Sequence, residues 1–266
     1  MSRIESTFTR LRSSGTTGLV TFVTAGDPDH INSGLILRAL DDAGADIIEV
    51  GVPFSDPLAD GPVIQRACER ALAAGATLSS ALALIAEVRS GVRAPIVVFS
   101  YVNPILHLGI TEFARCATEA GVDGVLVLDL PVEEASELRE ALTSVKIDMI
   151  FLVSPTTSDY RLQIAATLGR GFLYGISRLG VTGAHQELSS GARELAERVR
   201  AITAMPLAMG FGIASPEHVV EVGSFADATV VGSGLVNVVA ELAGSPSLPD
   251  KVRDYVSWLK SGTLKK

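Results

Sequence analysis

Short apolar runs alternate with amphipathic stretches along almost the whole chain, and this alternation restricts the fold more than any other feature. The runs resemble strands buried on both faces of a parallel sheet, at residues 19–24, 47–51, 96–101, 124–129, 149–153, 171–176, 207–210 and 228–232. Helical patterns lie between them, at residues 31–43, 77–89, 110–119, 133–145, 160–168, 192–203 and 217–222. About eight such units predict a (β/α)8 TIM barrel. A doubly wound open sheet shares the alternation and is the alternative.

Two further helical patterns fall outside this repeat. Residues 3–12 predict an extra N-terminal helix before the first strand, and residues 64–73 predict another after Pro62. The first strand is followed by Thr-Ala-Gly-Asp-Pro and not by GxGxxG, which counts against a dinucleotide-binding domain. No linker rich in Pro, Ser or Gly divides the chain, so residues 1–266 are expected to form a single barrel domain.

The composition excludes several classes of protein. With 47% hydrophobic residues the chain can form a large core, and its net charge of −8 argues against general nucleic-acid binding. Cys68 and Cys116 lie far apart, without a CxxC spacing or nearby histidine pairs, so neither a disulfide nor a zinc site is expected. The chain has no apolar leader and no run that could span a bilayer, which predicts a cytoplasmic protein without a membrane partner.

Two acids mark the second strand and the loop after it. Glu49 lies within an apolar strand, where an ionised carboxylate costs several kcal/mol unless it is paired, hydrated or protonated. The following loop is stiffened by Pro53 and Pro57 and carries Asp60. Two acids at the end of one strand suit proton transfer to and from a substrate. The alternative is that an Arg or Lys on a neighbouring strand holds Glu49.

Other functional candidates lie where strands end, because the active sites of barrels form there. They are Phe22 after the first strand, Tyr101 after the third, Asp129 after the fourth and Tyr174 in the sixth. Asp129 has an alternative role as the cap of a helix beginning near residue 132. The two tyrosines have the alternative role of ordinary packing at the barrel mouth.

Glycines after the last two strands indicate an anion site. Gly210 and Gly212 follow the seventh strand, and Gly232, Ser233 and Gly234 follow the eighth and open a helix. Glycines let backbone N–H groups approach an anion, and the helix N-terminus adds partial positive charge. The loops after strands seven and eight are the usual phosphate site of such barrels. Ordinary turns are the alternative reading of each GxG.

The loop after the sixth strand contains Gly180 and Gly183, with Arg178 and Thr182 as polar members. This composition predicts a mobile lid over the barrel mouth, with a long solvated connection as the alternative. The four histidines show no metal-ligand spacing and are interpreted as surface or capping residues.

Six segments in order resemble the tryptophan synthase alpha chain family: residues 22–28, 49–62, 101–104, 129–131, 177–183 and 210–216. The resemblance runs nearly end to end, and the long acidic segment with two prolines is its most specific part. It implies a barrel that cleaves indole-3-glycerol phosphate to indole and glyceraldehyde 3-phosphate, without cofactor or metal. It also implies a beta-chain partner that condenses indole with serine, in an alpha2beta2 complex.

The resemblance also implies a role for each matching residue. Glu49 matches the general acid/base, and Asp60 matches the acid that stabilises positive charge on the indole ring. The substrate-binding residues that it implies are Phe22, Tyr174, Thr182, Gly183, Phe211, Gly212, Gly232 and Ser233. Phe22 and Phe211 match walls of the indole pocket, Tyr174 lies near Glu49, and Thr182 meets Asp60 when the lid closes. Gly183, Gly212, Gly232 and Ser233 match the phosphate-binding backbone.

Two positions depart from the family pattern: Gly175 stands where a bulkier residue is expected, and Gly234 where alanine is commoner.

Three alternative functions differ in the residues that they require. A metal-dependent epimerase would need inward histidines and acids on several strands, and a non-catalytic partner would not need both Glu49 and Asp60. The sequence does not exclude the third alternative, a stand-alone lyase that releases indole.

Loops 53–62 and 103–109 carry Phe54 and Leu106 and are the expected surface for a beta chain.

Overall fold

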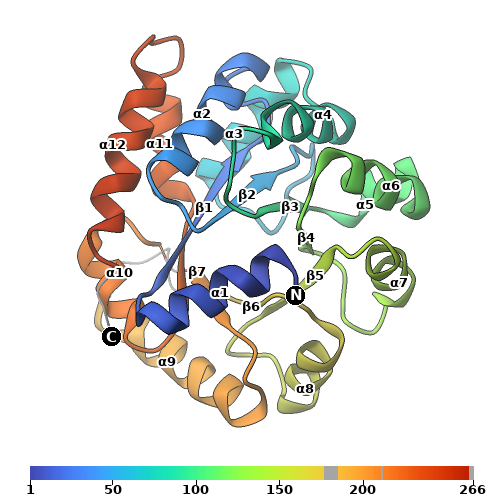
Figure 1. Ribbon diagram of the computed structural model, residues 1–266, viewed down its shortest axis with the longest axis vertical. Coiled ribbons are helices and arrows are strands. Elements are labelled where there is room, and N and C mark those ends of the chain that lie inside the picture. Colours follow the sequence, from blue (N-terminus) through green and yellow to red (C-terminus); the bar gives the residue numbers. More distant parts are fainter. Residues whose placement is uncertain (177–184, 211, 264–266) are drawn as a thin grey trace.

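Eight parallel strands close into a barrel in which each strand pairs with its neighbours in sequence and β1 pairs with β8 (Figure 1). The computed structural model describes residues 1–176, 185–210 and 212–263, and only the backbone of residues 185–190. The strands are β1 Gly18–Thr24, β2 Ile47–Gly51, β3 Ile96–Ser100, β4 Gly124–Val127, β5 Asp148–Val153, β6 Leu173–Ile176, β7 Leu207–Gly210 and β8 Ala228–Val231. The predicted barrel is confirmed, and the open sheet is excluded.

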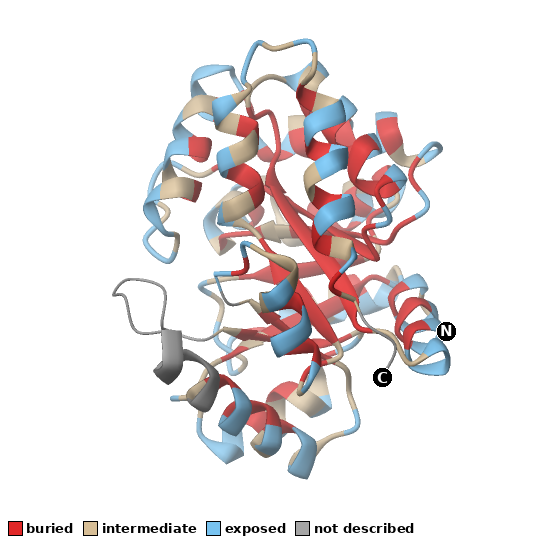
Figure 2. Cartoon of the chain, turned by 90° about the vertical axis from the view of Figure 1, so that its left-hand side faces the viewer, coloured by how far each residue is buried: buried red, intermediate tan, exposed pale blue. Residues whose placement is uncertain are grey.

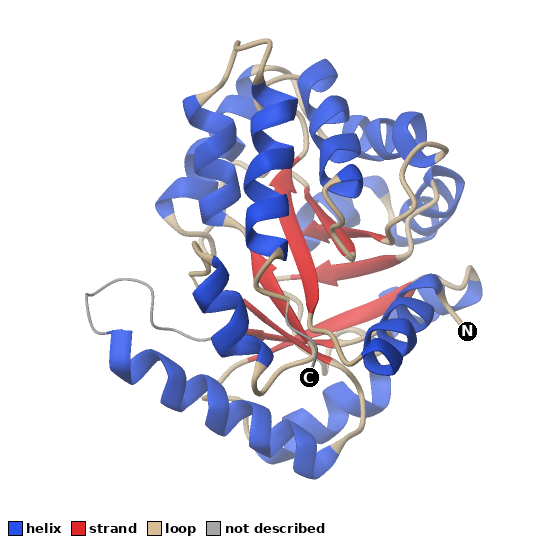
Figure 3. Cartoon of the chain, turned by 60° about the vertical axis from the view of Figure 1, so that its left-hand side comes forward, coloured by secondary structure: helices blue, strands red, loops and turns tan. Residues whose placement is uncertain are grey.

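Helices surround the barrel on all sides (Figure 3). They are α1 Arg3–Ser14, α2 His30–Asp42, α3 Pro62–Ala73, α4 Leu78–Arg89, α5 Val102–Leu108, α6 Ile110–Ala120, α7 Ser136–Ser144, α8 Asp159–Leu168, α9 His185–Ile202, α10 Pro216–Gly223, α11 Ser233–Glu241 and α12 Leu248–Lys260. Two expectations need correction. Residues 102–108 are helical where a loop was expected, and the helix predicted from residue 133 begins at Ser136.

The predicted extra helix, α1, covers the amino-terminal end of the barrel (Figure 1). It begins with a capping box, in which the Ser2 hydroxyl accepts the Glu5 N–H and the Glu5 carboxylate accepts the Ser2 N–H. Its buried face packs into the same apolar cluster as the residues inside the barrel. A side chain at Gly124 would meet Ile4 at 2.8 Å, so this strand has a glycine where the helix approaches most closely.

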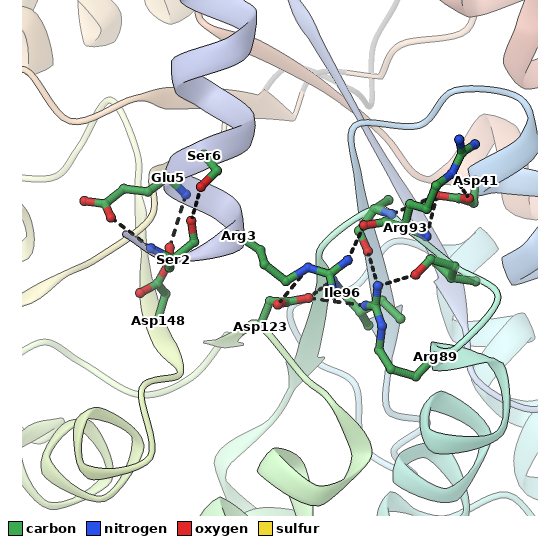
Figure 4. A network of polar contacts seen from close by, with 12 residues as sticks. Ser2, Arg3, Glu5, Ser6, Asp41, Arg89, Arg93, Ile96, Asp123 and Asp148 are labelled. Carbon is green, nitrogen blue, oxygen red and sulfur yellow. Dashed lines mark hydrogen bonds and ion pairs between the residues drawn. The ribbon is translucent and has the colours of Figure 1, made fainter.

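Aspartates at the amino-terminal ends of strands fix the register of the barrel. Asp46 accepts the Leu19 N–H at 2.8 Å, and Asp123 accepts the Ile96 N–H at 2.8 Å. Asp123 also forms ion pairs with Arg3 of α1 and with Arg89, which ties the helix to the barrel (Figure 4). These carboxylates order the end of the barrel opposite the expected active site.

Inside the barrel, the register sets Glu49 in a layer of otherwise uncharged side chains. At this level each odd-numbered strand pairs one residue with a residue of the next even-numbered strand. The pairs are Phe22 with Glu49, Phe99 with Leu126, Leu152 with Tyr174, and Gly210 with Val230. Alternate strands supply each layer of a TIM barrel, so these residues form two adjacent layers near the carboxyl ends of the strands. The strands are buried except for half-buried residues near some of their carboxyl ends, which are Phe99, Leu152, Ile176 and Gly210, and many exposed residues lie on the outer faces of the helices (Figure 2).

Within the described ranges, no single helix is long and apolar enough to cross a membrane. Among these described residues, one pair of helices, α3 and α4 taken together, has the required length and composition, and it is bent by 89°.

Candidate active site

Glu49 lies in the middle of β2, between Phe22 of β1 and Val97 of β3, and its side chain is 0% exposed. Neither of its carboxyl oxygens has a hydrogen-bond partner, and no ion pair involves it among the described residues. The alternative that an Arg or Lys holds this group is therefore wrong for the part of the chain that the structure describes. Burial raises the pKa of Glu49 to about 8, so the group is mostly protonated at neutral pH.

Three aromatic rings surround the space above Glu49. The Phe22 and Phe99 rings meet edge to face with centroids 5.1 Å apart, and Phe99 lies 6.1 Å from the Tyr174 ring. Two glycines make room for them, because a side chain at Gly51 would overlap the Phe22 ring and one at Gly210 would press on the Tyr174 hydroxyl. Burial raises the pKa of Tyr174 well above its usual value, and the nearby charges of the two acids add to this.

Sequence reasoning missed Phe99. The pattern that could have found it is the alternation within the third strand, since Phe99 shares a face with Val97, and Val97 neighbours Glu49.

Asp60 lies on the loop after β2, where Tyr101 holds its carboxylate. The Tyr101 hydroxyl donates to Asp60 Oδ2 at 2.9 Å and accepts the Ala59 N–H at 3.0 Å. Burial raises the pKa of Asp60, and the hydrogen bond from Tyr101 opposes that rise. The Phe54 ring packs on Tyr101, with centroids 5.0 Å apart. Tyr101 is therefore more than mouth packing: it fixes the position of the second acid.

The helix that follows Asp60 is anchored by residues that the sequence did not reveal. The Gln65 amide donates to the Asp60 carbonyl at 2.9 Å, which closes the loop onto α3. Arg70, on the same helix, donates two hydrogen bonds of 2.8 Å to the buried Asp27 in the loop after β1. These contacts bring the two loops together.

Asp129 does not cap the helix that follows it, so the alternative role as the cap of that helix is wrong. Its carboxylate accepts the Val102 N–H at 2.7 Å, and Val102 is the first residue of α5. Helix α7 begins seven residues further on, at Ser136, where the N-cap residue Ala135 supplies no side-chain hydrogen bond. Asp129 thus ties the end of β4 to the start of the helix after β3.

The glycines after β7 and β8 leave open space at the barrel mouth. Gly212 has a φ of 59°, and no atom of the described residues lies within 4 Å of the position that a side chain would take there. Gly232 is the N-cap of α11, and a side chain there would stand 3.8 Å from Phe22. Among the described residues, nothing accepts the N–H of Ser233 at the first position of this helix. Free N–H groups at a helix start favour an anion.

Three predicted site residues, Thr182, Gly183 and Phe211, lie outside the described residues, as does the predicted lid. Within the part of the chain that is described, no three His, Cys, Asp or Glu side chains are grouped so that they could hold a metal ion.

Packing explains both departures from the family pattern. A side chain at Gly175 would overlap the Met209 sulfur, so a bulky methionine on β7 fills the space that a larger residue on β6 would need. A side chain at Gly234 would overlap the hydroxyl of Tyr255 on α12.

A closed (β/α)8 barrel with a buried, unpaired carboxyl group beneath aromatic rings is typical of an enzyme that uses acid–base catalysis on an apolar substrate. The family model described as "Tryptophan synthase alpha chain" matches residues 8–260. The tryptophan synthase alpha chain of Geobacter sp. (strain M21) is 46% identical over 265 residues, covering 100% of this chain and 99% of the relative. This chain therefore belongs to the tryptophan synthase alpha chain family.

Solved structures agree with this assignment. Tryptophan synthase subunit alpha from Legionella pneumophila has a TM-score of 0.91 and 34% identity, covering 98% of each chain. A chain of tryptophan synthase from Mycobacterium tuberculosis, in an open form with BRD0059 bound, has a TM-score of 0.90 and 34% identity, covering 99% of each chain.

Proposed function

We propose that the barrel mouth cleaves indole-3-glycerol phosphate into indole and glyceraldehyde 3-phosphate, with Glu49 as the general acid and base. Family membership supports this reaction, a carbon–carbon lyase step of tryptophan biosynthesis. The observation that carries the assignment of Glu49 is its complete burial without a partner, which holds its pKa near 8. A carboxyl group in that state can donate a proton at neutral pH and take one back.

The cleavage requires Glu49 first to donate a proton and then to accept one. Protonated Glu49 gives its proton to C3 of the indole, which becomes an indoleninium cation. The bond from C3 to the glycerol carbon then breaks, and its electrons return to the ring. As the aldehyde forms, the hydroxyl on that carbon gives its proton to the Glu49 carboxylate, which restores the starting state.

Asp60 supplies the charge that stabilises the cation. Ionised Asp60 opposite the indole nitrogen would lower the energy of the charged intermediate, since a fixed charge acts strongly in a site that excludes water. Tyr101 supports this role, because its hydrogen bond favours the ionised form of Asp60 and holds the carboxylate in place. Thr182 is proposed to contact Asp60 when the substrate is bound.

The rest of the site binds the two ends of the substrate. Phe22 and Tyr174 are proposed as walls for the indole ring, together with Phe99 and Phe211. The phosphate is proposed to bind the backbone of Gly183, Gly212, Gly232 and Ser233. Binding energy at this remote group would hold C3 near Glu49.

Gly232→Val should raise the KM for indole-3-glycerol phosphate by about tenfold or more and change kcat less, because its side chain enters the phosphate space. Steady-state kinetics measure both constants, and inorganic phosphate should compete with substrate in the unsubstituted chain. Gly191→Val is the control, since no atom of the described residues lies within 4 Å of a side chain placed at position 191 on α9. An unchanged KM in folded Gly232→Val would move the phosphate site elsewhere.

The rim beside Asp60 is proposed to bind a beta chain. Leu58, on the loop that carries Asp60, is 94% exposed, and Leu106, on α5, is 55% exposed. Phe54 on the same loop packs on Tyr101, which in turn holds Asp60. A partner that orders Phe54 and Leu58 would therefore also order the second acid, and would couple binding to turnover.

Adding the cognate beta chain should raise the lyase activity of the isolated chain by about 5- to 150-fold, the usual range of such coupling. Leu106→Asp should weaken this activation more than it lowers the basal rate, because a charge would enter an apolar contact. Val220→Asp, on the outer face of α10, is the control and should leave activation unchanged. Full activity of the isolated chain with no response to the beta chain would favour a stand-alone lyase.

A further inference from the structure

A cavity of about 840 Å³ lies at the amino-terminal end of the barrel, opposite Glu49. Helix α1 forms one side, and the three segments that lead into β5, β6 and β7 form the other. Its volume lies within the range of small-molecule sites. None of its lining residues takes part in the proposed reaction.

Three cationic side chains line this cavity: Arg12 of α1, Lys146 before β5 and Arg170 before β6. Among the described residues, none of the three lies within ion-pair distance of a carboxylate, although the chain as a whole carries a net charge of −8. The acids that face the cavity, Glu5 and Asp148, are both bonded to Ser2 (Figure 4). Arg12 donates one long hydrogen bond of 3.5 Å to the Ala204 carbonyl, and the charge of Arg170 opposes the rise in the pKa of Asp148. Neither contact uses all the donors of its guanidinium group, so the three cations can still bind an anion from solution.

The backbone at Lys146 adds an independent observation. Lys146 has a φ of 64°, and no other described residue besides glycine has a positive φ. It ends α7 in a turn in which its N–H bonds to the Thr143 carbonyl and the Ile147 N–H bonds to the Leu142 carbonyl. Glycine fits such a turn at lower cost, so a lysine here gives up stability to place a cation at the cavity.

Part of the cavity wall is apolar. Phe8 of α1 is 4% exposed, packs on the Phe172 ring, and lines the cavity together with Met205 and Pro206. An apolar wall beside three cations that form no ion pair among the described residues suits a ligand with an aromatic ring and one acidic group. We propose that this cavity is a second binding site, for a small aromatic anion.

The test uses 8-anilinonaphthalene-1-sulfonate, a fluorescent aromatic anion, with the full-length chain. The measurements are made on Glu49→Gln saturated with indole-3-glycerol phosphate, so that the barrel mouth is occupied. Arg170→Gln and Lys146→Gly in that background should each weaken probe binding by about tenfold, the effect of one charge-assisted hydrogen bond. Arg38→Gln, an exposed cation on α2, should leave probe binding unchanged.

Lys146→Gly also separates a binding role from a structural one. It should raise the melting temperature, because glycine relieves the positive φ, while it weakens probe binding. Indole-3-acetate should displace the probe, whereas acetate, which lacks the ring, should not. Unchanged probe binding in both Arg170→Gln and Lys146→Gly, or no probe binding when the barrel mouth is occupied, would overturn the proposal. Neither result would affect the assignment of Glu49.

Discussion

Glu49→Gln should lower kcat for indole-3-glycerol phosphate cleavage by at least about 10²–10⁴-fold, the usual effect of losing a general acid or base. Glutamine has nearly the same shape and fits the same buried site, but it can neither give nor take the proton. Substrate binding should therefore persist, as measured by calorimetry. Glu137→Gln, an exposed position on α7, is the control for the chemical change. Near-normal turnover by a folded Glu49→Gln chain would show that another group moves the proton.

The raised pKa of Glu49 gives a second signature for the same residue. The pKa is about 8 in the folded chain and 4.5 for a glutamate free in water, so the folded state binds an extra proton between these values. The stability that protonated Glu49 contributes to the folded state is complete below pH 4.5 and is lost as the pH rises through about 8. The free energy of unfolding of the unsubstituted chain should therefore fall relative to that of Glu49→Gln between about pH 5 and pH 9, as measured by urea denaturation.

The rate of indole-3-glycerol phosphate cleavage should also depend on whether Glu49 is protonated. The value of kcat/KM should fall above about pH 8, because only protonated Glu49 can donate to C3. A flat profile to about pH 9, in a chain that stays folded, would contradict the assignment of Glu49 as the proton donor.

The order of strands and helices was predictable because buried parallel strands are apolar throughout and their helices are amphipathic. The closure of the sheet into a barrel was not predictable from that pattern. It depends on the pairing of β1 with β8, and these two strands lie about 200 residues apart in the sequence. The helix at residues 102–108 was missed because Asn103 and Pro104 favour a turn locally. In the structure, Asp129, from a distant strand end, accepts the first N–H of that helix.

The two acids were visible in the sequence because each breaks a local pattern: a charge within an apolar strand, and an acid in a stiff loop. Their partners were not visible. The bond from Tyr101 to Asp60 joins residues 41 apart, and the contact between Phe99 and Tyr174 joins two strands that are not adjacent. Such pairs form only when the strands are assembled side by side, so one sequence without its fold does not reveal them.

Asp60→Asn should lower kcat by about 10²–10³-fold, the effect of removing a group that stabilises charge in a transition state. Asparagine can keep the hydrogen bond with Tyr101, so the loop should stay in place while the negative charge is lost. Asp56→Asn is the matched control, because it makes the same change at an exposed position of the same loop. Single-turnover kinetics with the isolated chain would separate this effect from partner binding. Most of the activity remaining in Asp60→Asn would reduce Asp60 to a residue that packs the loop.

Tyr101→Phe separates the charge of Asp60 from its positioning. Removing the hydroxyl takes away one hydrogen bond, so the loss in kcat should be about tenfold and smaller than that of Asp60→Asn. If Tyr101 acts only through Asp60, the double variant should be no slower than Asp60→Asn alone, because contacting residues with one shared function are not additive. Losses that multiply in the double variant would mean that Tyr101 contacts the substrate itself. Tyr101→Phe keeps the ring that packs on Phe54 but loses the hydroxyl that bonds to Asp60 and Ala59. It should therefore loosen the loop and also reduce the activation by a beta chain, whereas Asp56→Asn leaves both of these hydrogen bonds intact.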